Sequence, residues 1–88
     1  MSGQNLEELR KIIDDIDEKI VGLLNERAKA ALLIKKFKLA NNLPILDKAR
    51  EEKIHQTIRQ RSNGLIKEAD LEKIYSLLLE IMRGIDDS

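Results

Sequence analysis

Two cations share one apolar stripe of the segment LLNERAKAALLIKKFK, which covers residues 23–38. Arg27 stands where a Leu or Ile would continue the stripe, and Lys38 follows eleven residues later. On a helix, eleven residues are about 1100° of rotation, so both side chains point the same way, roughly 16 Å apart along the axis. Their long side chains could converge on one small anion, and Ala30 and Ala31 leave room for it. The spacing therefore predicts an anion-binding pocket.

A third cation, Arg10, lies beside the same stripe, 17 residues before Arg27. That separation is roughly 25 Å along a helix, which is too far for the two to share a small ligand within one chain. In an antiparallel dimer of such helices, Arg10 of one chain can lie beside Arg27 of the other. The site and the dimer would then be one structure.

A second polar group lies in the stretch DKARE, at Asp47, Arg50 and Glu51. Asp47 and Glu51 are one helical turn apart and can face the same way. Two carboxylates on one edge can accept a hydrogen bond from a hydroxyl group, and the neighbouring Arg50 balances their charge.

Each of these residues also has an ordinary structural explanation. Arg27 could extend from the stripe to solvent, and a cation such as Lys38 is favoured at any helix C-terminus. Asp47 suits a helix N-cap, and Glu51 suits a solvated surface. The hypothesis of a binding site therefore depends on the joint spacing.

The element that carries the first three cations is predicted to be one long helix over residues 5–38. Its apolar residues recur in steps of three and four over more than four heptads, as in a coiled-coil seam. These seam residues are Leu6, Leu9, Ile13, Ile16, Ile20, Leu23, Ala30, Ile34 and Phe37. At 1.5 Å per residue the helix is roughly 50 Å long. The rest of the chain is too short to cover it, so we expect it to pair with another chain.

Two further helices are predicted after the break at ANNLPILD, which gives an all-α fold. Asp47 fits as the N-cap of a short, polar helix over residues 48–61. The turn SNG precedes a third helix over about residues 67–83, whose seam also follows steps of three and four and which ends at Gly84. With 88 residues, we expect a single domain over residues 1–88.

Composition excludes several classes of function. The 16 Lys and Arg balance the 16 Asp and Glu, which argues against general nucleic-acid binding. With no Cys and one His, His55, neither a thiolate nor a His-based metal site is expected. No signal peptide is visible and no apolar run approaches the ~20 residues of a membrane span. We therefore expect a cytoplasmic protein without membrane contact.

The chain resembles the all-α chorismate mutases, a class of intertwined helical homodimers. The pattern L-R-x-x-I-D-x-[IL]-D-x-x-[IL]-x-x-L-[IL]-x-x-R ends at Arg27 and is followed eleven residues later by Lys38. The pattern Pro-x-x-Asp-x-x-Arg-Glu then runs from Pro44 to Glu51, and together the matches cover residues 6–54 without a gap. The resemblance implies an intertwined, antiparallel homodimeric bundle of three helices per chain: one very long, one short and one medium.

The resemblance further implies an isomerase that rearranges chorismate to prephenate, the committed step of the shikimate pathway toward Phe and Tyr. The reaction is a unimolecular [3,3] shift that uses no proton transfer, nucleophile, metal or cofactor. Catalysis then comes from holding a chair-like conformer and from stabilising charge on the ether oxygen as its bond to carbon breaks.

Site residues follow from the resemblance by position. Arg27 binds one substrate carboxylate and Arg10, from the other subunit, binds the second, while Lys38 donates to the ether oxygen. The set that holds the substrate hydroxyl and supports that edge is Asp47, Glu51 and Arg50.

The third helix departs from the family pattern at two candidate positions. Met82 stands where the family usually has a small polar residue near a carboxylate, and is a candidate substrate-binding residue. Asp86 stands where Gln or Glu usually donates to the ether oxygen, and is a candidate catalytic residue. An ionised Asp would repel that oxygen, so this departure predicts low activity.

Three other functions fit parts of the same sequence. The domain could be a non-catalytic module that binds chorismate or prephenate and regulates a shikimate-pathway partner enzyme, such as a 3-deoxy-heptulosonate-phosphate synthase. It could be an isochorismate-pyruvate lyase, which shares the helical fold. It could also be a purely structural helical dimer.

Overall fold

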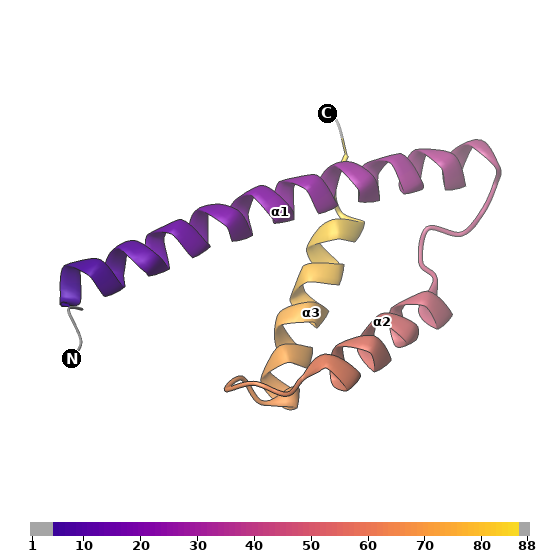
Figure 1. Cartoon of the computed structure of the whole chain (residues 1–88). Helices are drawn as coiled ribbons and strands as arrows, with labels where there is room; N and C mark the ends of the chain where they lie inside the picture. Colours follow the sequence, from indigo (N-terminus) through magenta and orange to yellow (C-terminus); the bar gives the residue numbers. More distant parts are fainter. Residues whose placement is uncertain (1–4, 87–88) are drawn as a thin grey trace. The chain divides into compact units, whose positions relative to one another are not determined.

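Three helices make up most of the computed structural model, which describes residues 5–86 (Figure 1). Helix α1 runs over Leu6–Ala40, α2 over Lys48–Arg61 and α3 over Glu68–Arg83. Each predicted range is correct to within two residues. The all-α prediction of one very long, one short and one medium helix is confirmed, and the described residues contain no strand.

The start of α1 is fixed by Asn5 as its N-cap. The Glu8 backbone N–H donates to Asn5 Oδ1 at 3.0 Å, which satisfies one of the N–H groups that a helix start leaves without an intrahelical partner. Glu7 and Glu8 stand in the first turn, where their charges favour the positive end of the helix dipole.

The end of α1 is a Schellman motif at Asn42, which adopts a left-handed backbone conformation with φ 56°. The Leu43 N–H donates to the Lys38 carbonyl at 2.8 Å, and the Asn42 N–H donates to the Leu39 carbonyl at 3.4 Å. Asn is among the few residues other than Gly that tolerate this conformation. The chain therefore turns sharply after α1, as the break at residues 41–44 predicted.

Helix α2 is polar, and its start is fixed by the predicted N-cap. Asp47 Oδ1 accepts a hydrogen bond from the Arg50 backbone N–H at 3.0 Å. Helix α3 is the apolar helix of the pair, and it carries Leu79 and Met82, the two buried residues of the described chain, with 6% and 8% exposure. Its N-cap, Lys67, makes no capping side-chain hydrogen bond.

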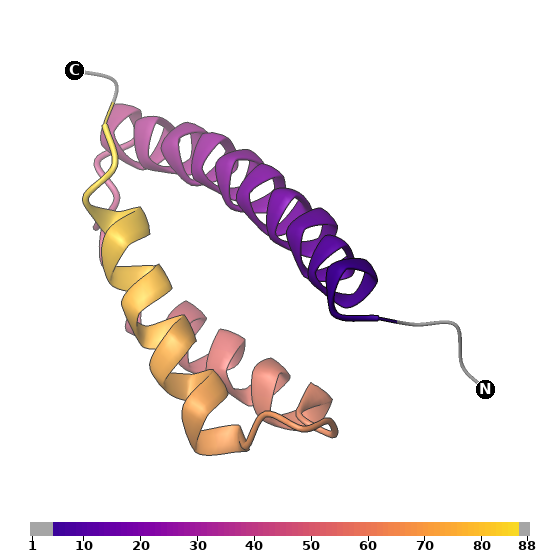
Figure 2. The ribbon, with the colours of Figure 1, turned by 90° about the vertical axis from the view of Figure 1, so that its left-hand side faces the viewer.

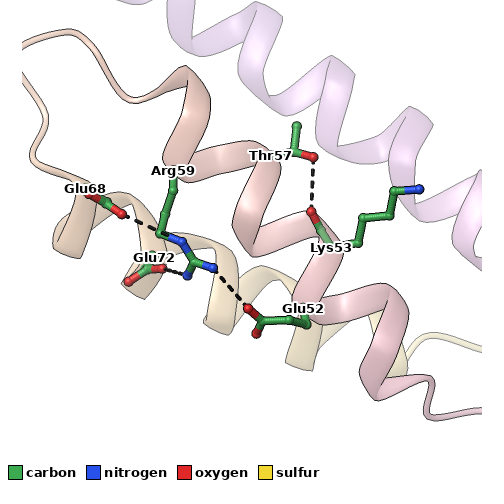
Figure 3. Close-up of polar contacts among 6 residues, drawn as sticks. All are labelled: Glu52, Lys53, Thr57, Arg59, Glu68 and Glu72. Carbon is green, nitrogen blue, oxygen red and sulfur yellow. Dashed lines mark hydrogen bonds and ion pairs between the residues drawn. The ribbon is translucent and has the colours of Figure 1, made fainter.

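Helices α2 and α3 lie side by side in both views (Figures 1 and 2), and Arg59 joins them (Figure 3). Its guanidinium contacts Glu72 of α3 at 2.5 Å and Glu52 of α2 at 3.0 Å, and its Nε lies 3.8 Å from Glu68. The hydrogen bonds that Arg59 donates to Glu72 and Glu52 raise the pKa of Arg59 above its usual value. Because the pKa of Arg59 is raised in the folded state, these contacts stabilise the fold throughout the neutral pH range. Their contribution is lost only in strong alkali, where the guanidinium loses its proton.

The chain divides into two units, and α1 contributes to both. The first unit, as far as the structure describes it, is residues 5–30, and none of these side chains is buried. The second is residues 31–86, with the end of α1, α2 and α3. Residues 5–30 therefore have no buried core of their own. The single domain expected over residues 1–88 remains a prediction.

Across residues 5–86, no helix has the length and hydropathy needed to cross a membrane.

Candidate active site

Lys38 lies in the last turn of α1 and is held by the loop that follows. Its carbonyl accepts the Leu43 N–H of the Schellman motif, and its Nζ donates to the Ile45 carbonyl at 3.2 Å. An ammonium group has three N–H donors, so this bond orients the group and leaves donor capacity for a ligand oxygen. The side chain is half-buried.

A cavity of about 260 Å³ is lined by both Lys38 and Asp47. The remaining lining residues are apolar: Leu43, Pro44 and Leu46. Small-molecule sites typically combine apolar walls with a few polar groups that fix orientation. The structure thus brings together two residues that the sequence analysis had taken from separate motifs, Lys38 and Asp47.

Asp47 and Glu51 stand at the start of α2, one turn apart. Asp47 acts as the N-cap, but a carboxylate can accept about four hydrogen bonds, so capping does not exhaust its capacity. Glu51 is half-buried, and its Oε2 is paired with Arg83 Nη1 of α3. Arg50 is exposed beside them.

The last two candidate residues, Met82 and Asp86, lie at and just beyond the end of α3. Met82 is buried with 8% exposure in the packed face of the helix. Asp86 lies beyond the end of α3 at Arg83 and the C-cap at Gly84, and it is exposed. The predicted binding role of Met82 and the predicted catalytic role of Asp86 remain predictions.

Arg10 and Arg27 belong to the first part of α1. Arg10 is exposed and lies 3.7 Å from Glu7 in a local ion pair, whereas Arg27 is half-buried. The joint role of the two arginines with Lys38 remains a prediction.

Two cations near the candidate site were missed in the sequence analysis. Arg83 pairs with Glu51 across 32 residues, and Lys35 Nζ donates to the carbonyls of Arg83 and Ile85 at 3.3 and 2.9 Å. In the sequence, both are ordinary basic residues near helix ends, and no local pattern links them to Glu51. The Arg83–Glu51 pair depends on how α3 packs against α2, and the Lys35 hydrogen bonds depend on how the end of α3 lies against the last turns of α1.

The described residues thus form a small all-helical fold in which a lysine and a carboxylate line one cavity. The chain belongs to the chorismate mutase type II family, whose model matches residues 9–86. The predicted family is confirmed.

Two curated relatives share the family name. The chain is 43% identical over 87 residues to a bifunctional chorismate mutase/prephenate dehydratase of Aquifex aeolicus, covering 94% of this chain and 24% of that protein. It is 37% identical over 82 residues to a chorismate mutase of Methanocaldococcus jannaschii, covering 88% of this chain and 79% of that protein. The chain therefore spans about a quarter of the bifunctional relative and most of the second one.

A solved structure has the same fold. The chorismate mutase (form I) from Thermus thermophilus aligns with a TM-score of 0.86 at 23% identity, covering 90% of this chain and 99% of that chain. At this identity the likeness shows the helical fold alone.

Proposed function

We propose that this chain catalyses the rearrangement of chorismate to prephenate, without a cofactor, as a homodimer with shared active sites. The observation that carries the proposal is the cavity lined by both Lys38 and Asp47. It occurs in a chain that belongs to the chorismate mutase type II family over residues 9–86.

Lys38 has the central chemical role in this proposal. In the [3,3] shift, the ether C–O bond breaks as a new C–C bond forms, and no proton is transferred. Negative charge builds up on the ether oxygen, and a fixed N–H donor there stabilises the transition state more than the substrate. The hydrogen bond from Lys38 Nζ to the Ile45 carbonyl supports this role, because it holds the ammonium group before the substrate arrives.

Asp47 and Glu51 accept the hydrogen bond of the substrate hydroxyl, and Arg50 offsets their charge. The N-cap contact fixes Asp47 at the start of α2, and the pairing with Arg83 restrains Glu51. Both contacts support a preformed edge, because a carboxylate that is already in place loses less conformational entropy on binding.

Arg27 binds one substrate carboxylate and Arg10 of the second subunit binds the other. The exposed seam of α1 supports the required dimer. Leu9, Ile13 and Leu23 are 44%, 56% and 64% exposed, and a continuous apolar seam of this kind marks a surface that another helix covers.

Met82 and Asp86 complete the proposed set. The burial of Met82 supports a packing contribution from this side chain, and its thioether is only a weak acceptor, so we assign it no step. Only a protonated Asp86 can donate to the ether oxygen, and activity should therefore rise as pH falls. Replacing Asp86 by Gln should raise the rate at neutral pH, because the amide donates without protonation.

The direct test is the formation of prephenate from chorismate by the purified chain, with the dimer confirmed by sedimentation in the same buffer. The proposal expects turnover by the wild type and faster turnover by Asp86→Gln at neutral pH. Equal rates for the two proteins, with profiles that are flat from about pH 5 to 8, would remove Asp86 from the site. Undetectable conversion by a confirmed dimer would overturn the proposed activity.

A role as a regulatory domain of a shikimate-pathway enzyme is a second outcome of the same test. The bifunctional relative carries a dehydratase in the same polypeptide, which supports a pathway enzyme as a covalent or separate partner. Calorimetric binding of prephenate without turnover would assign the regulatory role.

The proposal also includes a cytoplasmic location, which cell fractionation tests.

A further inference from the structure

We propose that Arg83 is a positioning residue that holds the Glu51 carboxylate for the substrate hydroxyl, an inference that rests on the proposed function. Arg83 Nη1 pairs with Glu51 Oε2 across the α2–α3 contact, 32 residues away in the chain. The two side chains are 38% and 26% exposed, so the pair is shielded more than an ordinary surface ion pair. Arg83 itself needs no contact with substrate in this role.

Lys35 fixes the other end of Arg83. Its Nζ donates to the Arg83 carbonyl at 3.3 Å and to the Ile85 carbonyl at 2.9 Å. These carbonyls lie at the C-terminus of α3, where a cation satisfies groups that have no intrahelical partner. The backbone of Arg83 is thus held from α1, while its guanidinium holds Glu51 on α2.

Glu51 needs such a restraint for two physical reasons. A free Glu side chain samples many rotamers, and ordering it on binding costs conformational entropy. Asp47 and Glu51 are also carboxylates one turn apart, and their like charges repel. The Arg83 guanidinium offsets this repulsion and selects one Glu51 conformation before the substrate binds.

The chain contains a matched control for this inference. Arg59 also joins α2 to α3, but its partners are Glu52, Glu68 and Glu72, none of which is a proposed site residue (Figure 3). Removing Arg59 tests how the α2–α3 contact alone affects the enzyme. Removing Arg83 tests the same contact together with the position of Glu51.

The experiment measures kcat and KM for chorismate in the full chain, with melting temperatures at one protein concentration. The Glu51 hydrogen bond to the hydroxyl is present in substrate and transition state alike, so its loss should raise KM and leave kcat nearly unchanged. For Arg83→Met we expect KM to rise roughly 3- to 5-fold, the scale of a partly exposed ion pair. Arg59→Met should lower the melting temperature without raising KM.

Two further variants separate positioning from general damage. In a Glu51→Gln background, Arg83→Met should cause no additional rise in KM, because the carboxylate that it holds is gone. Arg83→Lys keeps the charge but not the planar guanidinium, and its KM should lie between those of wild type and Arg83→Met. Arg83→Lys also keeps the test valid if Arg83→Met does not fold.

Three results would overturn the inference: an unchanged KM in folded Arg83→Met, an equal rise in the Glu51→Gln background, or a matching rise in Arg59→Met. Failure of the proposed function gives a different result, because the wild type itself would then form no prephenate. In that case the positioning role is excluded together with the activity. The melting temperatures of the Arg83 and Glu51 single and double variants still report whether the ion pair exists.

Discussion

Residues 5–30 and residues 31–86 differ in where their apolar side chains lie. The first region has the more regular apolar seam, yet its seam residues are exposed, with Ile13 at 56% and Ile20 at 48%. The second region contains the polar helix α2, yet it has the buried residues Leu79 and Met82 and long-range polar contacts through Arg59, Arg83 and Lys35. A regular apolar seam therefore does not imply that other residues of the same chain bury it.

The difference suggests to us that the two regions have different roles in the proposed dimer. A seam with steps of three and four is typical of a helix that packs against another helix of similar length. Residues 5–30 contain only the first part of α1, so this region holds no second helix that could cover its own seam. The second region has the capped helix α2, the ion pairs of Arg59 and the cavity lined by Lys38. We therefore expect the first region to supply assembly and the second to supply most of the site.

The largest effect is expected from Ile13→Asp, which disrupts the apolar seam of residues 5–30. A carboxylate in the centre of an apolar helix interface has no partner, and its burial costs roughly 3–5 kcal/mol. The dimer should dissociate and helicity should fall, as measured by sedimentation equilibrium and circular dichroism. Lys19→Asp, at an exposed polar position of the same helix, is the control. A stable Ile13→Asp dimer would show that the seam is not the interface.

The next effect is expected from Lys38→Met, which leaves both regions folded and removes the donor to the ether oxygen. Loss of one such donor lowers kcat roughly 10²- to 10³-fold. The comparison is Lys29→Met, which removes an exposed lysine from the same helix and should retain the wild-type rate. If both variants lose activity equally, Lys38 has no special role in catalysis.

A smaller effect, in the direction of higher stability, is expected from Lys67→Asp. Lys67 is the N-cap of α3 but makes no capping hydrogen bond, unlike Asp47 of α2. An Asp at this position can accept from the first turn and favours the helix dipole, which should raise the free energy of unfolding by about 1 kcal/mol. Urea unfolding at fixed protein concentration measures it. Lys67→Ala gives no acceptor, and an equal gain from Ala would refute the capping explanation.

The smallest effect is expected from Asn42→Gly at the end of α1. With φ at 56°, Gly relieves the small penalty that a side chain carries in this conformation, and stability should rise by about a few tenths of a kcal/mol. Asn42→Ala should instead lower stability by about 1 kcal/mol. Chemical unfolding of the two variants, measured side by side, resolves their difference, and equal stabilities would contradict the left-handed conformation.

The sequence was sufficient for features that depend on neighbouring residues. The bounds of α1, α2 and α3, the Asp47 cap and the end at Gly84 all follow from local apolar spacing and capping preferences. The family followed from matches within residues 6–54, and the family model over residues 9–86 confirms it.

The contacts that hold the candidate site could not be predicted in the same way. The Arg83–Glu51 pair spans 32 residues and the Lys35 hydrogen bonds span 48 and 50. Contacts between residues this far apart depend on how the helices pack, and a Lys or Arg near a helix end is favoured locally whether or not it has a distant partner.

The most direct test of the central claim mixes two chains that are each defective in one region. Arg10→Met removes a cation of the first region, and Lys38→Met removes the donor of the second; each homodimer should be nearly inactive. After co-refolding, half of the dimers are mixed, and each mixed dimer has one intact site of two, so about a quarter of the wild-type activity should return. Activity that stays at the average of the two separate variants would contradict an active site shared between the first region of one chain and the second region of the other.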